Sequence, residues 1–278
     1  MSATKSMKRD RRTKEVVLGI LTFVVILLFS FPFIWMLLAS FKTQAQIMST
    51  SQFLFFTPTG KNYAKVFGEY EFLRFIWNSF VVAVGSTVGS LILGLPAAYA
   101  IARYRLQGLG LIILVARIIP GITFLIPWFI IFSGLGLVDT YTALILSHML
   151  VGLPFIIWVM ISFFEGLPHE IEEAGLIDGC TRNQVFRRII LPISGPGIIT
   201  SSLLSFIFSW NNFMFSIILA GDKTKTLPIA VFNFMSYSEI NWGALMAAAC
   251  MITLPVLIIA LLAQRYIVSG LAAGAVKG

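Results

Sequence analysis

Long apolar runs separated by short polar segments dominate the chain. Six runs are long enough for the roughly 20 residues that a helix needs to cross the hydrocarbon core of a bilayer. They cover residues 16–41, 76–102, 110–133, 141–164, 193–220 and 243–267. No segment between them is long enough for a second folded domain. The pattern therefore predicts an all-α fold, a polytopic membrane bundle of six transmembrane helices.

Basic residues are distributed unevenly around these runs. With the N-terminus inside, 13 Lys and Arg lie in the inner segments and six in the outer ones. The positive-inside rule then places both termini in the cytoplasm. The basic segment 1–15 precedes a run far longer than the apolar region of a signal peptide. We therefore interpret the first run as a retained transmembrane helix.

Composition supports a membrane protein. The chain has 278 residues, of which 58% are apolar and 12% charged, whereas a soluble domain has about 45–50% and about 25%. The net charge of +8 follows from the flanks of the apolar runs, so it gives no reason to expect nucleic acid as a partner. Two cysteines and two histidines without close spacing provide neither a disulfide framework nor a metal cluster.

One polar segment, residues 165–192, differs from the other connections. Acidic residues in a first helical turn and Gly179 after a helix end predict one short helix. Thr181 and Gln184 have the spacing of a capping box for a second helix, which we expect Pro192 to end. The segment is thus predicted to form a helix–turn–helix outside the membrane, where it would dock on a partner.

The spacing in this segment also matches a known pattern. From Glu173 it reads Glu-Ala-Gly, three residues, Gly179, nine residues, Ile189, one residue and Leu191-Pro192. This resembles the EAA loop of permease subunits in ATP-driven bacterial importers, with Gly175 in place of the second Ala.

The resemblance extends beyond the loop. Asn78-Ser79, Ala97-Ala98-Tyr99-Ala100 with Arg103, Trp210-Asn211-Asn212-Phe213 and the closing segment 270–278 are similar to the carbohydrate branch of this family, in particular to its six-helix, maltose-type permease. The chain departs from the branch at Asn212, where a Glu is frequent.

The resemblance implies the type I ABC importer permease fold and a division of labour. Segment 1–15 would be a cytoplasmic N-terminus, 16–73 the first helix with an outer loop, 74–265 the core permease domain and 266–278 a cytoplasmic tail. The coupling loop, about 165–192, would dock on the ATPase. Its expected coupling residues are Glu170, Glu172, Glu173, Ala174, Gly175, Asp178, Gly179, Arg182, Phe186, Arg187, Ile189, Leu191 and Pro192.

The resemblance also implies the partners and the location. We expect a second, longer permease chain, two ATP-binding subunits, an extracytoplasmic binding protein, membrane lipid and a carbohydrate substrate, in the bacterial inner membrane. The chain has no Gly-x4-Gly-Lys-Ser/Thr loop for nucleotide phosphates. It would therefore be a transport subunit rather than an enzyme and bind no cofactor itself, with ATP and Mg held by the partners.

Polar residues inside the runs are candidates for the substrate path. Arg117 would line the path or, alternatively, snorkel toward the cytoplasmic surface or bridge to a carbonyl of a neighbouring helix, because a charge in the membrane normally has a partner or a cavity. Trp210, Asn211 and Asn212 would hold a sugar or, alternatively, bond between helices.

Several residues are candidates for other roles. Gly85 and Gly89 suit close helix packing, within this chain or toward another. Ser147 and His148 are consecutive on a helix, so they do not face each other as a catalytic pair. The outer-loop residues Glu239 and Trp242 could meet the delivering protein or be solvated.

Two further classes compete with the importer subunit. An ion-gradient-driven secondary transporter should carry ionisable residues for coupling inside the membrane, and no Asp or Glu lies well inside any run. An intramembrane enzyme would need a catalytic cluster, which the sequence does not provide.

Overall fold

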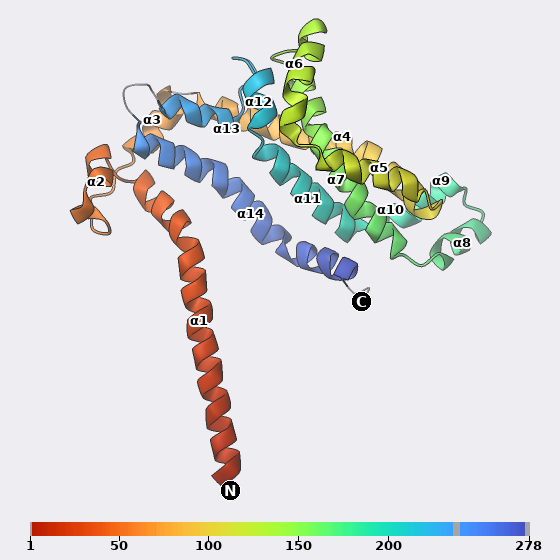
Figure 1. The fold of residues 1–278 in the computed structure, drawn as a ribbon, viewed down its shortest axis with the longest axis horizontal. Coiled ribbons are helices and arrows are strands. Elements are labelled where there is room, and N and C mark those ends of the chain that lie inside the picture. Colours follow the sequence, from red (N-terminus) through yellow and green to blue (C-terminus); the bar gives the residue numbers. More distant parts are fainter. Residues whose placement is uncertain (1, 70, 236–239, 276–278) are drawn as a thin grey trace. The chain divides into compact units, whose positions relative to one another are not determined.

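The computed structural model of the protein describes residues 2–69, 71–235 and 240–275. Within these ranges the regular structure is helical, and an isolated antiparallel bridge between Met235 and Ile240 is the only β feature. The all-α expectation is therefore confirmed (Figure 1).

The chain forms two compact units. The first comprises Met1–Glu69 and Phe234–Met251, and the second comprises Tyr70–Asn233 and Ile252–Gly278. The long helix α14 (Trp242–Ala275) belongs in part to each. The other helical elements of the first unit are α1 (Ser2–Ser40), α2 (Gln44–Met48), the 3-10 turn η1 (Thr50–Gln52) and α3 (Lys61–Glu69).

Helix α1 carries the first predicted span. Its residues Lys14–Ser40 form a 27-residue apolar stretch that the described protein leaves uncovered except at its end, where Ala39 and Ser40 are buried. A helix that is apolar all round and uncovered suits a lipid environment or the apolar surface of another membrane helix. The helix begins earlier than the predicted run, at Ser2.

Lys42 organises the segment that follows α1. Its side chain is fully buried, and its ammonium donates to the carbonyl of Gln52 at 2.9 Å and to that of Phe53 at 2.7 Å. It also lies 4.5 Å from the ring centre of Trp35 and 4.6 Å from that of Phe56. Burial lowers the pKa of Lys42, while the carbonyls and aromatic faces stabilise its charge.

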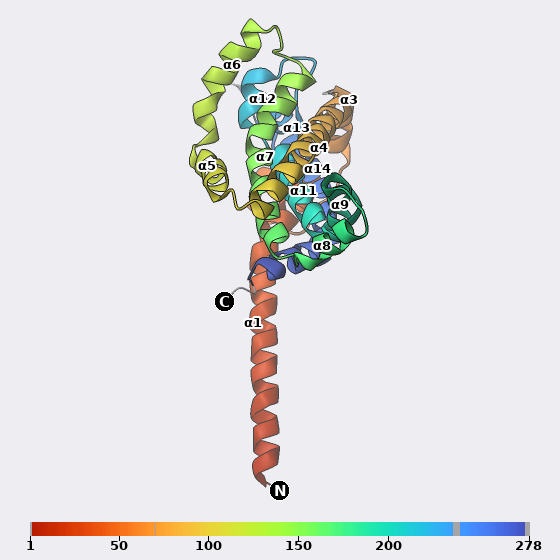
Figure 2. The same cartoon turned by 90° about the vertical axis from the view of Figure 1, so that its right-hand side faces the viewer.

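The second unit contains most of the described helices. They are α4 (Phe72–Arg103), α5 (Gln107–Ile118), η2 (Gly121–Phe124), α6 (Leu125–Gly134), α7 (Tyr141–Glu165), α8 (Glu170–Ile177), α9 (Arg182–Val185), the π-helical turn η3 (Phe186–Ile190), α10 (Leu191–Ile193), α11 (Gly195–Trp210), α12 (Met214–Leu219), α13 (Leu227–Ala230) and η4 (Val231–Phe234). Helices α4, α7 and α11 pack side by side (Figures 1 and 2).

Small residues bring α4 close to α7. A Cβ added to Gly85 would lie 2.6 Å from Cδ1 of Ile145, and one added to Gly89 would lie 2.8 Å from the sulfur of Met149. Both distances are shorter than van der Waals contact, so the two helices approach where a side chain is missing. The interpretation of Gly85 and Gly89 as packing residues within this chain is confirmed.

Four described helices are long and apolar enough to cross a membrane by themselves, and two bent pairs make up to six spans. In the predicted run 110–133, the pair α5 and η2–α6 is bent by 87°. Ile119 has an extended backbone with ψ of 123° before Pro120, as steric contact with a following proline favours. The expectation of one continuous helix there was wrong, because hydropathy does not register this break.

The run 193–220 is also interrupted. The segment Arg182–Ile193 is bent by 75° relative to α11, and α11 ends at Trp210 before α12 begins at Met214. The last run, 243–267, is longer in the structure, where α14 extends from Trp242 to Ala275.

Candidate functional site

The helix–turn–helix predicted between residues 165 and 192 is present, and it begins with α8. Glu170, Glu172 and Glu173 occupy the first turn, where their charges favour the positive end of the helix dipole. The helix begins at Glu170, with His169 as its N-cap. The acidic first turn is confirmed.

A glycine ends α8 as expected. Gly179 has φ of 86°, a left-handed conformation that a residue with a Cβ rarely adopts. Its N–H donates to the carbonyl of Leu176 at 3.1 Å, and the N–H of Cys180 donates to that of Gly175 at 3.0 Å. These two bonds form a Schellman motif, which satisfies carbonyls at the helix end.

The second short helix begins with the predicted capping box. The hydroxyl of Thr181 accepts from the N–H of Gln184 at 3.4 Å, and the side-chain oxygen of Gln184 accepts from the N–H of Thr181 at 2.7 Å. The helical segment continues through η3 and α10 to Ile193, so it ends one residue after Pro192, where the sequence predicts its end. The wider π turn before Pro192 accommodates a ring that would clash in a regular α-helix.

Gly175 is the point where α8 packs on the second short helix. It is buried, and an added Cβ would lie 2.6 Å from Cδ1 of Ile189 and 3.2 Å from Cγ2 of Val185. The missing Cβ therefore allows close contact between α8 and the α9–η3 segment. Ile189 packs inside the loop at this point.

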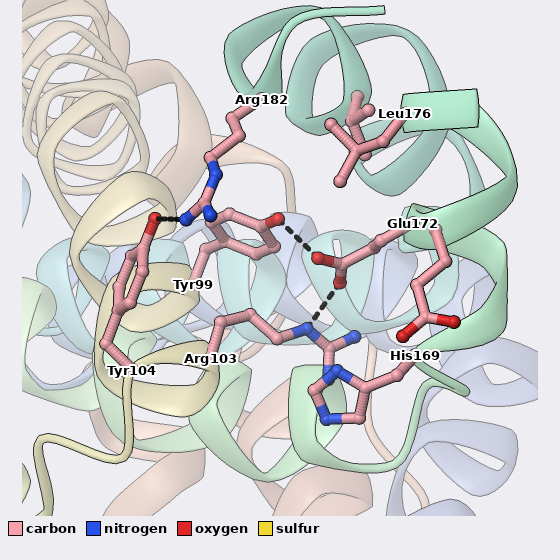
Figure 3. A pocket seen from close by; sticks show the side chains of 9 residues that line it. Tyr99, Arg103, Tyr104, His169, Glu172, Leu176 and Arg182 are labelled. Carbon is pink, nitrogen blue, oxygen red and sulfur yellow. Dashed lines mark hydrogen bonds and ion pairs between the residues drawn. The ribbon is translucent and has the colours of Figure 1, made fainter. Parts of the chain in front are cut away.

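Glu172 fastens α8 to the end of α4. Its two carboxylate oxygens accept from the hydroxyl of Tyr99 at 2.7 Å and from Nε of Arg103 (Figure 3). Arg103 also donates to the carbonyl of Leu167 at 3.3 Å. The side chains of Arg103 and Glu172 are only 6% and 14% exposed. A charge-assisted pair with so little solvent around it holds α8 firmly in place.

Arg182 adds a second link to the same region. Its guanidinium donates to the hydroxyl of Tyr104 at 2.8 Å and lies 5.8 Å from that ring's centre. A cavity of about 180 Å³ lies between these groups (Figure 3). It is lined by Tyr99, Arg103, Tyr104, His169, Glu172, Glu173, Leu176, Arg182 and Val185.

One side of α8 faces outward. Glu170, Glu173, Ala174 and Ile177 are exposed, and their spacing places them on one helical face, with Glu173 also lining the cavity. Ile177 is 85% exposed. The outward face thus combines acidic side chains with an exposed apolar one.

The remaining predicted loop residues divide by burial. Phe186 packs inside, with its ring centre 4.8 Å from that of Tyr99, and Leu191 is half-buried. The others are exposed: Asp178, Gly179, Arg182, Arg187 and Pro192.

The sequence pattern did not predict a role for Tyr104, nor for Tyr99 and Arg103 as partners of Glu172. A Tyr and an Arg four residues apart at the end of an apolar run could have indicated an acidic partner.

Comparison with known proteins identifies the family. Residues 90–272 match the family described as "Binding-protein-dependent transport system inner membrane component". The chain belongs to this family. The matched segment contains the whole of residues 165–192 and the end of α4 that holds them.

Relatives cover almost the full chain. It is 36% identical over 274 residues to the probable ABC transporter permease protein y4oR of Sinorhizobium fredii, which is 98% of this chain and 99% of the relative. It is 35% identical over 277 residues to the trehalose/maltose transport system permease protein MalG of Thermococcus litoralis, with coverage of 97% and 99%.

A solved structure shows the same fold. It is the crystal structure of a bacterial ABC transporter involved in the import of the acidic polysaccharide alginate. The TM-score is 0.78 at 24% identity, over 93% of this chain and 98% of that one. The expected ABC importer permease fold is confirmed.

Family membership decides between the classes left open by the sequence. The chain is a multi-pass inner-membrane transport component of the ABC importer class, as predicted, and the ATPase is a separate subunit. A secondary transporter is excluded. In the described residues no group of three or more His, Cys, Asp or Glu side chains could hold a metal ion.

Arg117 of this permease lies against α7. Its guanidinium carbon is 4.8 Å from the ring centre of Phe155 and 5.4 Å from that of Trp158. The aromatic faces of the neighbouring helix thus stabilise the cation. The partners of Arg117 are thus aromatic rings rather than the helix carbonyl of the bridging alternative, and its place in the substrate path stays a prediction.

Trp210, Asn211 and Asn212 form the break between α11 and α12. Trp210 is 2% exposed and its indole N–H donates to the carbonyl of Ile252 in α14 at 3.1 Å. The amide of Asn211 donates to the carbonyl of Ile207 at 3.0 Å. The amide oxygen of Asn212 accepts from an N–H of α12 at 3.1 Å. These amide bonds are local, not interhelical, whereas Trp210 does connect two helices.

The two remaining candidate sets have structural partners. His148 Nδ1 lies 2.7 Å from the hydroxyl of Ser209, whereas the hydroxyl of Ser147 donates to the carbonyl of Leu144. The expectation that Ser147 and His148 do not face each other is confirmed. The backbone N–H of Trp242 donates to Gln44, and Glu239 lies outside the described residues.

Proposed function

We propose that this chain is the permease subunit of an importer that translocates a carbohydrate delivered by an extracytoplasmic binding protein. Dependence on a binding protein is part of the family description. The carbohydrate is supported by the names of relatives, which include permeases for trehalose/maltose, sulfoquinovosyl glycerol and diacetylchitobiose.

The observation that carries the coupling part of the proposal is the attachment of α8 to α4 through Glu172. In this proposal two separate subunits bind ATP and Mg. Each permease chain presents one docking face to one of them, and in this chain the docking face is the exposed side of α8 with Glu170, Glu173, Ala174 and Ile177. Because Arg103 and Tyr99 fix α8 to the end of a long helix, movement of the docked ATPase is transmitted to α4. This is rigid-body coupling through a docked element.

The rest of the assembly follows from the same proposal. We place a second, longer permease chain and lipid around the apolar spans, and both termini in the cytoplasm. We assign 1–15 to the N-terminal segment, 16–73 to the first helix and outer loop, 74–265 to the core domain and 266–278 to the tail. Arg117, Asn211 and Asn212 remain the candidates for the substrate path, and Arg117→Leu should then lower uptake without loss of assembly.

Two glycines provide a matched test of the docking face. Gly179 follows α8 and Gly136 follows α6, and both have positive φ, 86° and 66°, with open space where a Cβ would point. Asp at either position introduces the same charge at a residue with positive φ. The tagged chain would be purified in mild detergent with its partners, as wild type, Gly179→Asp and Gly136→Asp.

We expect wild type and Gly136→Asp to bring down the ATP-binding subunits and a second permease. Gly179→Asp should retain the second permease and lose the ATPase, and sugar with binding protein should stimulate ATP hydrolysis only in the complexes that keep it. Equal loss of the ATPase in both variants, or none in Gly179→Asp, would contradict docking at α8.

A further inference from the structure

An acidic side chain binds a loop at the end of the bundle opposite α8. Asp139 lies just before α7, and one of its carboxylate oxygens accepts from the N–H of Gly221 at 2.9 Å and from the N–H and hydroxyl of Thr224 at 3.0 and 2.7 Å. The other oxygen accepts from the N–H of Lys223 at 3.2 Å. Residues 220–227, from the end of α12 to the first residue of α13, are called the clasp loop.

Helix α4 holds the same loop from another direction. The amide nitrogen of Asn78 donates to the carbonyls of Lys223 and Lys225 at 3.1 and 2.9 Å. The amide oxygen of Asn78 accepts from the hydroxyl of Tyr141 in α7 at 2.6 Å. The hydroxyl of Ser79 accepts from the N–H of Leu227 at 2.8 Å. The start of α4 and the start of α7, which are distant in sequence, thus both contact the clasp loop.

The contacts are close, and part of them is buried. Asn78 and Ser79 are 1% and 3% exposed, and Thr224 and Thr226 are buried as well, whereas Asp139 is half-buried and Lys223 is exposed. A Cβ added to Gly221 would lie 3.1 Å from the Cβ of Asp139, so the backbone of the loop lies directly against this side chain. Separating these groups would leave the buried amide of Asn78 and the N–H of Thr224 without their partners.

Asp139 also has an unusual backbone. Its φ is 61°, in the left-handed region, and its N–H donates to the carbonyl of Leu219 at 2.9 Å. A residue other than glycine keeps this conformation only when its surroundings impose it. Here Asp139 donates through its own N–H to the end of α12 and accepts through its carboxylate from the clasp loop. Both sets of bonds join the start of α7 to the segment that begins at the end of α12.

We propose that Asp139 is a positioning residue for transport. It joins the starts of α4 and α7 to the clasp loop as one body that stays closed throughout the transport cycle. Conformational change then takes place at the interrupted spans, such as the bend at Pro120, rather than between these segments. The proposal rests on the ATP-driven uptake proposed above.

A disulfide tests whether the segments ever separate. The Cβ separation of 3.1 Å between Asp139 and Gly221 is slightly below the usual range of about 3.5–4.5 Å, so small shifts would permit a bond. The double variant Asp139→Cys/Gly221→Cys would be assembled with its partners in liposomes, and uptake measured in reduced and oxidised samples. The linked peptide would be identified by mass spectrometry. Both single cysteine variants are controls for the native Cys180 and Cys250.

We expect the reduced double variant to transport about tenfold more slowly per assembled complex, because the carboxylate that joins α7 to the clasp loop is lost. Oxidation should raise uptake toward the wild-type rate, since the disulfide restores a link between the two segments, although it accepts none of the lost hydrogen bonds. Uptake that is normal when reduced and lost when oxidised would overturn the proposal.

A second variant separates positioning from folding. Asp139→Gly removes the carboxylate but permits φ of 61° without strain. We expect normal yield of the complex and slower uptake per complex. Reduced yield with unchanged uptake per complex would assign Asp139 a purely structural role and contradict the proposal. Wild-type complex without ATP-dependent uptake would instead contradict the proposed function, independently of the clasp loop.

Discussion

Helix α4 is anchored at both ends, and the two anchors differ in chemistry. At its C-terminal end, Arg103 and Tyr99 hold the carboxylate of Glu172 in α8. At its N-terminal end, Asn78 and Ser79 hold the clasp loop through neutral groups, and the carboxylate of Asp139 holds the same loop through neutral N–H and hydroxyl donors. Loss of one member of a buried ion pair leaves an uncompensated charge, whereas loss of one neutral bond leaves the others in place. The α8 anchor should therefore fail more sharply than the clasp.

The helix between the anchors is suited to transmit force. Gly85 and Gly89 bring α4 against α7 along its length, and close packing makes a helix pair move as one element. Displacement of α8 would thus reach α4 and α7 together. The comparison predicts that substitutions at either anchor alter coupling, with the larger loss of stability at α8.

The largest effect is expected for Glu172→Ala. Arg103 would remain nearly buried without its carboxylate, which typically costs about 3–5 kcal/mol. Thermal unfolding of the purified complex in detergent should show a lower Tm. The control is Glu173→Ala. Glu173 follows Glu172 in sequence but lies on the docking face, so its loss should change the Tm little because that side chain is exposed. The double variant Glu172→Ala/Arg103→Ala should be more stable than the sum of its single changes predicts.

A Glu172→Ala complex as stable as wild type would show that the pair does not hold α8. The comparison between the two ends of α4 would then no longer stand.

At the clasp, Asp139→Ala should cost about 1–2 kcal/mol, because partly buried donors of the loop lose their acceptor. Asp139→Gly removes the same bonds but avoids the left-handed strain, so it should be less destabilising by roughly 1 kcal/mol. Denaturation of the two variants side by side separates the carboxylate from the backbone. Equal stability of both variants would contradict the contribution of strain at this residue.

The α8 region was predictable from sequence where its contacts are local. Thr181 and Gln184 are three residues apart, and Gly179 ends the helix through its own backbone, so the pattern contains both partners of each bond. Glu172 and Arg103 are 69 residues apart, and only the fold brings them together. The clasp loop was missed for the same reason, since Asp139 meets residues 82 to 85 positions away.

Prolines explain why the spans were only partly predictable. Pro154 and Pro255 lie inside the continuous helices α7 and α14, whereas Pro120 marks a sharp bend. Pro120 is followed by Gly121, which adds backbone freedom at the same point. Hydropathy is similar in all three regions, so an apolar run predicts a span without predicting its straightness.

A smaller effect tests whether the local packing of the coupling loop is as tight as the geometry indicates. Gly175→Ala improves helix propensity by about 1 kcal/mol, but its Cβ would lie 2.6 Å from Cδ1 of Ile189. Ile189→Val removes that carbon at a cost of about 0.5–1.5 kcal/mol. In a double-mutant cycle on unfolding, the pair should be more stable than the two changes add up to. Strict additivity would show that Ile189 moves aside freely.

The smallest effect concerns pH and the clasp alone. Burial would raise the pKa of Asp139, but hydrogen bonds from the Thr224 hydroxyl and from the N–H groups of Lys223, Gly221 and Thr224 outweigh it and lower the pKa below its usual value. A carboxylate with a lowered pKa in the folded state stabilises the protein above its unfolded pKa of about 3.9 and loses that contribution as the pH falls further.

Asp139→Asn tests this contribution, because the amide cannot titrate and places a donor opposite the N–H of Lys223. The difference in Tm between wild type and Asp139→Asn should therefore be constant from pH 7 to 5 and shrink below about pH 4. Because other carboxylates titrate equally in both proteins, a difference that stays constant to pH 3 would show that the carboxylate of Asp139 is not held by the clasp loop in solution.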